Sequence, residues 1–370
     1  MKKVLLTATV QSHICQFHRP LVEMLHEQGI EVHVAARDNL AEKNGLVLDF
    51  VDKVFDVPFA RSPKSTDNIK AYKQVKKIID EGEYDVVHCN TPMGGIVTRL
   101  AALKARKKGT RVFYTAHGFH FYKGAPKKNW LFFYPIEKIF SRITDSLITI
   151  TKEDYELASK KFCCKITHIH GVGANSDKFY VISNEEKEQI RKELNLDLDT
   201  KVILNVGELL PNKNQKSIIL AMPKIIKELP NVKLFIAGNG PEKENIELLI
   251  KQHNLENSVI LLGYTTELQK YMNICDVLVA CSYREGLPVN LMEAMLCGKP
   301  IVASDNRGHK ELVQNEVNGY IVGKEDIDAY ARQVLNVLQA KKIRSEDCLK
   351  VVEPFKYKNV KEELREIYIL

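Results

Sequence analysis

The sequence lacks any long hydrophobic run and any close C-x-x-C pair of cysteines. No apolar stretch among its 370 residues reaches the roughly 18 residues that a transmembrane helix needs. The eight cysteines are scattered apart from Cys163 and Cys164, which excludes a cysteine-based zinc site and a disulfide framework. Lys2 and Lys3 lead directly into residues 4–10, an apolar run too short for a signal peptide. We therefore expect a protein of the reducing cytosol.

Positive charge is unevenly distributed along the chain, whose formal net charge is +7. Residues 1–180 hold 28 lysines and arginines against 19 aspartates and glutamates, a net of +9, and the remaining residues hold 26 against 28, a net of −2. This asymmetry indicates an anionic partner for the first half, which nucleic acid, an anionic membrane surface or a lipid-phosphate substrate would each provide. The sequence carries no helix-turn-helix, RNA-binding or zinc-finger signature in favour of nucleic acid.

Short β-branched runs alternate with helical patterns along the whole chain. Seven strand-like runs precede residue 182, from KVLLTATV to KITHIHG, and six follow it, from KVILNVGE to GYIV. This alternation predicts βαβ units with a parallel sheet, and two such series predict two doubly wound α/β domains. We expect these domains at residues 1–182 and 183–350, and a C-terminal helix in residues 351–370 that packs back on the first domain.

The stretch SYREGLPVNLMEAMLCGKPIVASD places two glutamates around a helix start. Proline suits the first position of a helix and glycine its end, so residues 288–297 are predicted to be helical. The amide groups at the start of this helix suit a phosphate. Glu285 precedes the helix and Glu293 lies in its second turn, so both could lie beside a phosphate bound at the helix start. A carboxylate that close to an anion is unfavourable unless it accepts hydrogen bonds from sugar hydroxyls. The stretch predicts a phosphate flanked by sugars, although an amphipathic helix with two solvated acids has the same pattern.

Glycines follow successive strands of the second half. NVGELLPNKN contains Gly207 and Lys213, IAGNGPEKE contains Gly238 and Gly240, and LLGYTTE contains Gly263. Ligands bind outside the carboxyl ends of the strands in open α/β sheets. A single glycine there is typical of an ordinary turn. Glycines at four successive strand ends, the EGLP site included, favour a ligand lying across this edge, with Lys213 meeting a phosphate.

Histidines mark the equivalent edge of the first half. YTAHGFHFYKG places His117 at a strand end, with His120 and Lys123 in the following loop, and TATVQSHICQFHRP places His13 and His18 after the first strand. Histidine hydrogen-bonds hydroxyls and transfers protons near neutral pH. A structural role is the alternative for a lone histidine. Loops at this edge carry function, however, which favours ligand contacts.

Basic and aromatic residues gather in the middle of the first half. A cationic cluster is predicted from Arg99, Lys104, Arg106, Lys107, Lys108 and Arg111, and Lys123, Lys127 and Lys128 precede the run WLFFYPI. Cations beside an interfacial aromatic group indicate association with an anionic membrane surface. The alternative is a solvated helix face followed by a buried apolar segment.

These motifs resemble the retaining glycosyltransferases of family four, which have the GT-B fold. The resemblance rests on Glu285 and Glu293 in E-x7-E spacing, on EGLP followed by CGKPIVASD, and on VGELLPNKN, AGNGPE, LLGY and NGYIV in the family order. TATVQSHICQFHRP and TAHGFHFYKGAPKKNWLFFYPIEK are similar to a bacterial subgroup that builds capsule and exopolysaccharide repeat units. The resemblance covers nearly the whole chain. It implies two Rossmann-like domains facing a central cleft, the first binding the acceptor and the second the nucleotide sugar.

The resemblance also implies roles for single residues. Glu293 would hold the ribose hydroxyls, Glu285 the hydroxyls of the donor sugar, and Lys213 the diphosphate. The rest of the donor site would be Gly207, Gly238, Gly240, Gly263, Gly286, Leu287 and Pro288. His117 would lie near the reaction centre and act in catalysis with Glu285 and Lys213. The acceptor side would be formed by His13, His18, His120 and Lys123.

The implied reaction moves a sugar, with retention of configuration, from a nucleotide sugar to a glycan or a lipid-diphosphate-linked acceptor at the inner face of the plasma membrane. Uridine diphosphate is the expected carrier, for example in a UDP-N-acetylhexosamine. Lys213 and the helix N-terminus supply the positive groups that the departing diphosphate needs, so no metal or other cofactor is expected. One departure is Glu208, where many members have arginine. A carboxylate cannot pair with diphosphate, so either Lys213 neutralises more of the phosphate charge, or another cation joins it, or Glu208 serves the acceptor side. A further hypothesis is that Glu208 acts as a base for the acceptor hydroxyl.

Two other function classes stay open at this point. A nucleotide-sugar epimerase has the same two-domain fold, but the E-x7-E spacing and the EGLP loop argue against it. A non-catalytic module that binds anions or nucleic acid has only the basic first half in its favour. Epimerised sugar formed without an acceptor would favour the epimerase, and steeply salt-dependent DNA binding would favour the module.

Overall fold

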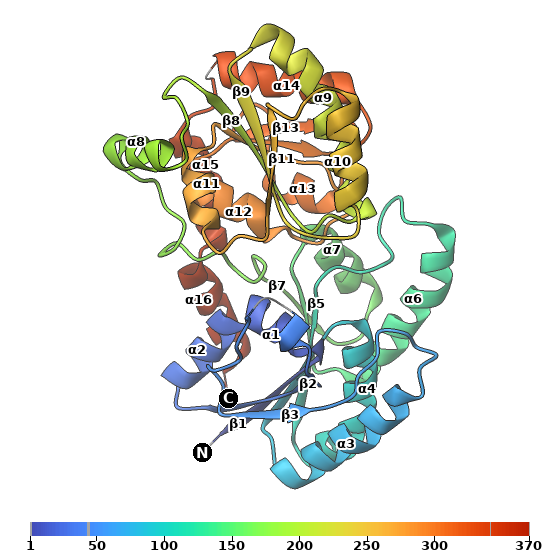
Figure 1. The fold of residues 1–370 in the computed structure, drawn as a ribbon. Helices are drawn as coiled ribbons and strands as arrows, with labels where there is room; N and C mark the ends of the chain where they lie inside the picture. The colour runs from blue at the N-terminus through green and yellow to red at the C-terminus, as the bar shows by residue number, and fades with distance from the viewer. Residues whose placement is uncertain (1, 43–44, 341, 370) are drawn as a thin grey trace. The chain divides into compact units, whose positions relative to one another are not determined.

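The polypeptide divides into two structural units. The structure is a computed structural model that describes residues 2–42, 45–340 and 342–369. One unit comprises Met1–Gly173 and Tyr357–Leu370, and the other comprises Ala174–Lys356 (Figure 1). Among the described residues, no helix combines the length and the apolar character needed to cross a membrane.

The first unit is built on a seven-stranded parallel sheet with the order β3-β2-β1-β4-β5-β6-β7. The strands are β1 (Lys3–Val10), β2 (Glu31–Arg37), β3 (Lys53–Asp56), β4 (Val86–Asn90), β5 (Arg111–Ala116), β6 (Ser146–Thr149) and β7 (Lys165–His168). The helices are α1 (Gln11–Phe17), α2 (Arg19–Glu27), α3 (Asp67–Gly82), α4 (Pro92–Ala101), α5 (Leu103–Arg106), α6 (Lys127–Phe140), α7 (Lys152–Lys161) and α16 (Tyr357–Ile367). The buried central strands are rich in β-branched residues, as parallel strands covered on both faces require.

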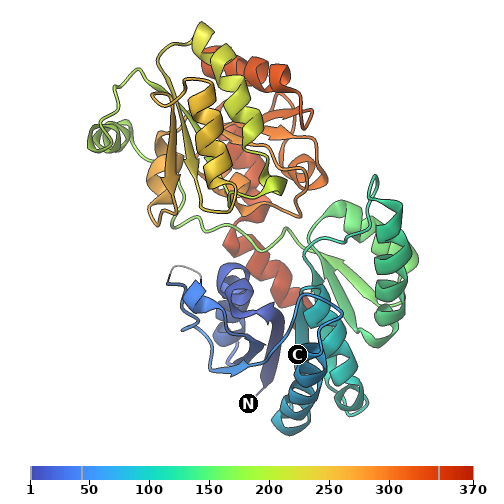
Figure 2. The ribbon, with the colours of Figure 1, turned by 45° about the vertical axis from the view of Figure 1, so that its right-hand side comes forward.

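The second unit is built on a six-stranded parallel sheet with the order β10-β9-β8-β11-β12-β13. Its strands are β8 (Lys201–Val206), β9 (Val232–Ala237), β10 (Val259–Gly263), β11 (Val277–Ala280), β12 (Ile301–Ser304) and β13 (Gly319–Val322). Its helices are α8 (Asn184–Glu193), α9 (Lys216–Glu228), α10 (Lys243–Gln252), α11 (Leu268–Ile274), α12 (Val289–Leu296), α13 (Arg307–Leu312), α14 (Ile327–Ala340) and α15 (Ser345–Val352). Figure 2 shows helices on both faces of this sheet.

Alternate residues of the second sheet enter two separate cores. Ile203, Val277 and Val302 pack in one core with side chains of α9 and α14. Val202 and Leu278, the neighbours of two of these residues, pack in the other core with side chains of α12 and α15. Burial of apolar side chains on both faces stabilises the sheet and holds the carboxyl ends of its strands in a fixed order.

The predicted fold class is confirmed, because each of the thirteen predicted runs contains a strand and all paired strands of both sheets are parallel. The boundary between the units differs from the predicted one. It lies between Gly173 and Ala174, because the Ala174 amide donates to the Phe355 carbonyl at 2.8 Å and Phe179 is buried in the second unit's core. Loop-like composition before residue 182 therefore did not mark the end of the first unit.

The C-terminal segment divides between the units rather than acting as one piece. Val352 and Phe355 are buried in the core of the second unit, beyond the predicted boundary at residue 350. Helix α16 belongs to the first unit, where it packs against α2 (Figure 1). The Lys361 ammonium lies 2.7 Å from the Glu23 carboxylate of α2, and Tyr368 is fully buried.

Each sheet has a point at which the chain reverses its direction of winding. In the first sheet this point lies between β1 and β4, and in the second sheet it lies between β8 and β11. Loops that follow these strands lead away to opposite sides and leave room for a ligand at the carboxyl ends. These two places are where the predicted site residues are to be sought.

Candidate functional site

Lys213 lies at the reversal point of the second sheet, in the turn that follows β8. Asn214 continues this turn in the left-handed region, at φ 52°, and its side-chain amide donates to the Cys281 carbonyl at 3.3 Å. The Asn212 side-chain amide donates to the Arg284 carbonyl at 3.0 Å. The turn after β8 is thereby fastened to the loop after β11, which carries EGLP.

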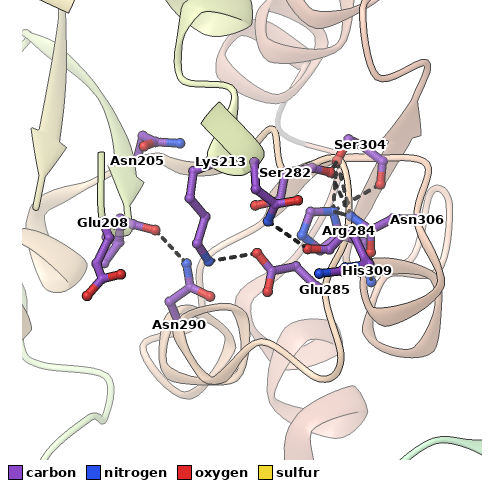
Figure 3. Close-up of polar contacts among 12 residues, drawn as sticks. Asn205, Glu208, Lys213, Ser282, Arg284, Glu285, Asn290, Ser304, Asn306 and His309 are labelled. Carbon is purple, nitrogen blue, oxygen red and sulfur yellow. Dashed lines mark hydrogen bonds and ion pairs between the residues drawn. The ribbon is translucent and has the colours of Figure 1, made fainter. Parts of the chain in front are cut away.

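These hydrogen bonds bring Lys213 and Glu285 together although 72 positions separate them in sequence. The Lys213 ammonium donates to the Glu285 carboxylate at 2.7 Å, and the two side chains retain 26% and 16% of their exposure. Figure 3 shows the two side chains pointing toward each other. Both line a pocket of the second unit whose wall also includes Asn205, Gln215, Asn290 and His309. The pair holds a cation and an anion at the edge of one pocket, within reach of a small polar ligand.

Helix α12 begins beside this pair. Pro288 is extended, at φ −78° and ψ 118°, and is the N-cap, so the helix is one residue shorter at each end than the predicted 288–297. Gly298 ends it at φ +69°, in the left-handed region that the prediction required. No side chain among the described residues caps the helix start, which leaves its first amide groups available to an anion. The Asn290 side chain donates to the Val206 carbonyl at 2.9 Å and ties the helix to β8.

His309 also lines the pocket, and Asn306 and Gly308 lie beside it in the same segment; none of the three was predicted from the sequence. The Asn306 side chain caps α13, accepting from the His309 amide at 3.0 Å. The His309 ring is buried, and burial lowers its pKa to about 4, so the imidazole is neutral near pH 7. A Cβ on Gly308 would lie 2.2 Å from the Gly286 carbonyl oxygen. Asn306 and His309 follow β12 directly, and polar residues at the carboxyl end of a strand were treated as candidates after β8 and β11. The same argument applied to β12 would have identified them in the sequence.

Glu293 lies in the second turn of α12, as predicted. Desolvation raises the pKa of its carboxyl to about 7, although Lys178 acts in the opposite direction. Burial therefore holds this carboxyl partly protonated near neutral pH. Hydroxyl donors from a bound ligand would stabilise its ionised form.

The predicted glycines lie at the strand ends but serve the packing of the loops. A Cβ on Gly238 would lie 2.0 Å from the Gly207 carbonyl oxygen, and one on Gly240 would lie 2.4 Å from the Leu209 carbonyl oxygen. Gly263 has φ +68° and accepts from the Gly238 amide at 2.8 Å. The close backbone approach that was expected from a ligand is therefore already made between loops at Gly238 and Gly240. Contact of these glycines with a donor stays a prediction.

Three of the predicted histidines gather at the reversal point of the first sheet. His13 lies on α1, His18 joins α1 to α2, and His117 follows β5. The Nε2 atoms of His13 and His117 lie 3.2 Å apart, and the Asn90 Oδ1 lies 3.2 Å from the same nitrogen of His117. Desolvation lowers the pKa of all three imidazoles, that of His117 to about 4, so the three rings are neutral at physiological pH.

The other two predicted acceptor residues lie elsewhere in the following loop. The His120 ring stacks on Phe133 of α6, with centroids 4.7 Å apart. Lys123 is exposed, and its backbone amide donates to the Glu153 carboxylate at 2.6 Å. The structure thus gathers His13, His18 and His117 but does not bring His120 or Lys123 into that group. Glu208, the hypothesised base, is exposed after β8.

The predicted cationic cluster of the first half is partly wrong. Arg99 is 1% exposed and donates to the buried Glu137 carboxylate at 3.0 Å, with its guanidinium over the Tyr114 ring. Arg106 forms a short ion pair with Asp145 at 2.6 Å. Both arginines stabilise the first unit rather than a surface partner. Lys104, Lys107 and Lys108 are exposed, as predicted.

Two protein-family models match this chain. The model described as "Glycosyl transferase 4-like" matches residues 3–151, and the model described as "Glycosyl transferases group 1" matches residues 186–349. The chain is 40% identical over 335 residues to the "Putative glycosyltransferase EpsD" of Bacillus subtilis (strain 168), which covers 90% of this chain and 86% of that protein. The protein therefore belongs to the family-four glycosyltransferases and is a glycosyltransferase, as the sequence motifs predicted.

A more distant relative and a solved structure agree with this assignment. The chain is 28% identical over 345 residues to the Escherichia coli "UDP-Gal:alpha-D-GlcNAc-diphosphoundecaprenol alpha-1,3-galactosyltransferase", with 89% of this chain and 88% of that protein covered. The structure of HepE from Anabaena in complex with UDP-glucose matches with a TM-score of 0.76 at 19% identity, over 99% of both chains. The shared architecture is the GT-B fold. None of these matches favours an epimerase or a nucleic-acid-binding module.

Proposed function

We propose that the protein transfers a sugar, with retention of anomeric configuration, from a UDP-sugar to a lipid-diphosphate-linked or glycan acceptor in the synthesis of a surface polysaccharide. The single observation that carries this proposal is the Lys213–Glu285 pair beside the uncapped start of α12, at the reversal point of the second sheet. Two proteins similar to this chain support the substrate class: the Escherichia coli enzyme uses UDP-galactose and a diphosphoundecaprenol acceptor, and HepE binds UDP-glucose.

The second unit would hold the donor through complementary charge. The diphosphate would accept hydrogen bonds from the first amide groups of α12 and from the Lys213 ammonium. The Glu285 carboxylate pairs with that ammonium at 2.7 Å. If a diphosphate accepts the hydrogen bond of Lys213 instead, the Glu285 carboxylate can accept hydrogen bonds from hydroxyls of the transferred sugar. The backbone of Gly286, Leu287 and Pro288 would run between these two contacts.

Glu293 would bind the ribose of the nucleotide. Its ionised carboxylate would accept from two vicinal hydroxyls, which lowers the pKa of the carboxyl from the value of about 7 that it has without ligand. Gly207, Gly238, Gly240 and Gly263 would line the remaining edge of the donor.

Catalysis would rest on stabilising the departing nucleoside diphosphate. Breaking the sugar–phosphate bond places negative charge on the phosphate oxygens and makes the sugar oxocarbenium-like. Preorganised cations and amide groups at the leaving group stabilise that charge without reorganisation, so we propose that donor cleavage needs no metal. His117 would hydrogen-bond the transferred sugar from the first unit, with His13, His18, His120 and Lys123 on the acceptor side.

The first unit would also contact an anionic lipid surface at the cytoplasmic face of the membrane. Leu131 and Phe132 on α6 are 70% and 64% exposed, and Lys127 and Lys128 on the same helix are exposed. Large apolar side chains beside lysines are favourable at a lipid headgroup boundary and unfavourable in water. A lipid-linked acceptor would reach the enzyme along such a surface.

Calorimetric titration with a panel of nucleotide sugars tests the donor site without the acceptor. We expect one UDP-sugar to bind with micromolar affinity, and the Glu293→Ala variant to lose about tenfold or more, because a buried hydroxyl–carboxylate contact contributes about 1.5–3 kcal/mol. Glu256→Ala, an exposed acid on the same unit, is the matched control. Unchanged affinity in Glu293→Ala would contradict the proposed ribose contact. Analysis of the sugar after incubation without acceptor separates binding from epimerisation.

A further inference from the structure

We propose that His13, His18 and His117 form a binding site for a divalent transition-metal ion of the zinc class in the first unit. One ring nitrogen from each of these three residues lies within 4.8 Å of the other two. The proposal goes beyond the proposed function, which assigns His13 and His18 to the acceptor side and His117 to the transferred sugar, and which needs no metal at the donor diphosphate. The binding test below does not depend on either substrate.

The distance between His13 and His117 fits a shared metal. Zn–N bonds of about 2.0–2.1 Å in a tetrahedral site place two ligand nitrogens about 3.3 Å apart. The two Nε2 atoms lie 3.2 Å apart, and their rings meet edge to face at an interplanar angle of 88°. The two nitrogens therefore have the spacing of two ligands of one ion, and an ion would replace the hydrogen bond that joins them.

His18 supplies the second, independent observation. Its ring is 4% exposed, and its Nε2 atom has no hydrogen-bond partner among the described residues. A buried polar atom without a partner is destabilising, and a metal ligand bond removes that penalty. Because this nitrogen forms no hydrogen bond, a bond to a metal ion would replace none. The His18 and His117 rings lie edge to face, with centroids 5.4 Å apart and an interplanar angle of 88°.

The ligand set selects the class of metal. Imidazole nitrogens suit zinc, copper, nickel and iron, whereas magnesium and calcium require several oxygen ligands. The candidate ligand group among the described residues contains histidines and no carboxylate. The Asn90 carboxamide, whose Oδ1 lies 3.2 Å from the His117 Nε2, is positioned as a fourth ligand or as a hydrogen-bond acceptor for a metal-bound water.

A bound ion would change the role of His117. A ring nitrogen that ligates a metal cannot also donate to or accept from a sugar hydroxyl. If His117 contacts the transferred sugar, a point that rests on the proposed function, then the metal either presents a bound water in its place or inhibits transfer. Metal binding itself is measured without this assumption.

Titration of metal-free protein with Co²⁺ tests the site. We expect one equivalent of Co²⁺ to produce the intense visible d–d bands of a four-coordinate ion, and Zn²⁺ to displace it. His13→Gln and His18→Gln should each weaken binding by about 100-fold or more, since even the loss of a supporting residue costs about 10–100-fold. His26→Gln is the matched control, because His26 is exposed and pairs with Asp52 at 2.9 Å. Thermal unfolding of each variant, measured without metal, establishes that it folds.

Three results would overturn the proposal. Weak bands typical of six-coordinate Co²⁺ would show that no such site forms. Equal affinity in His13→Gln, His18→Gln and the wild type would place the ion elsewhere. Thiolate charge-transfer bands would place it on a cysteine such as the exposed Cys163. A negative result here would leave the nucleotide-sugar titration unaffected, so the two proposals fail separately.

Discussion

At the scale of single residues, Glu293 links pH, stability and binding. Its folded pKa of about 7 lies above the ordinary value of 4.5, so folding favours the protonated form. The associated stability is present below about pH 4.5 and is lost as the pH rises through 7. At about 1.4 kcal/mol per pKa unit, the loss is at most about 3 kcal/mol.

The Glu293→Gln substitution should remove this pH dependence. A neutral amide has no proton to lose, so the variant should match the wild type near pH 4.5 and be more stable by about 1–3 kcal/mol at pH 8, in the absence of nucleotide. Urea unfolding at both pH values measures the difference, and Glu256→Gln is the control for an exposed acid. Identical slopes of stability against pH in wild type and variant would contradict the raised pKa.

Lys213 should act on the phosphate part of the donor. The Lys213→Met substitution removes the ammonium group that would bind the diphosphate. We therefore expect the affinity for UDP to fall about tenfold or more while the affinity for uridine is unchanged. Turnover should fall by about 100-fold or more, as for other preorganised groups at a developing charge. Lys310→Met is the control, since Lys310 is exposed and pairs with Asp305 at 2.7 Å. An equal loss of affinity for uridine and UDP would point to a structural role instead.

The sequence predicted the identity of these residues better than their contacts. Lys213 and Glu285 were assigned from strand-end positions and resemblance, and both line the same pocket. Their ion pair was not predicted, because it requires β8 and β11 to be neighbours, and the order of strands in a sheet is not encoded in local composition. The close approach of His13 and His117, which are 104 positions apart, was not predicted for the same reason.

At the scale of elements, the loop that carries EGLP is held by the start of α13. Gly308 packs so closely on the Gly286 carbonyl that any side chain would displace the loop. Gly308→Ala should therefore move residues 286–288 and weaken binding of the nucleotide sugar by about tenfold, while the fold is retained. Gly323→Ala is the control, because a Cβ there lies 3.1 Å from the Asp326 Cβ but no nearer than 4.0 Å to any backbone atom. Calorimetry measures the affinity, and unchanged binding in Gly308→Ala would show that the loop position is unimportant.

Helix and strand positions followed from local chemistry, while element boundaries depended on tertiary contacts. Gly298 ends α12 in the predicted conformation because only the left-handed region closes that turn. Pro288 proved to be the N-cap rather than the first helical residue, since its ψ of 118° is set by the extended EGLP loop before it. Phe179 illustrates the same limit at the boundary between units, because its burial depends on a core assembled from distant strands.

At the scale of the whole molecule, the basic excess lies in the first half of the sequence. Residues 1–180 carry a net charge of +9 against −2 for the rest. Two of the predicted surface cations, Arg99 and Arg106, form ion pairs within the first unit instead. Composition reports how many charges a segment has but not which of them are compensated inside the fold. The exposed lysines of α5 and α6 therefore carry the remaining argument for an anionic surface.

Membrane association should depend on both the apolar and the basic side chains of α6. Leu131→Ser with Phe132→Ser removes two side chains that are 70% and 64% exposed, so folding should be little affected. Burial of each such side chain contributes about 1.5–3 kcal/mol, and the double variant should bind vesicles rich in phosphatidylglycerol about 100-fold more weakly than the wild type. Sedimentation with vesicles measures this binding, and added salt should weaken the wild type as well.

The matched control for this change lies in the second unit. Leu248 on α10 is 56% exposed, and Leu248→Ser should leave vesicle binding unchanged. Lys127→Gln with Lys128→Gln should reduce binding to anionic vesicles by about tenfold or more, since each basic residue near such a surface contributes about 1 kcal/mol. Equal binding of the wild type to phosphatidylcholine and phosphatidylglycerol vesicles would show that charge plays no part. Unchanged binding of the Leu131 and Phe132 double variant would show that α6 is not the contact, and acceptor delivery along this face of the first unit would then have to be abandoned.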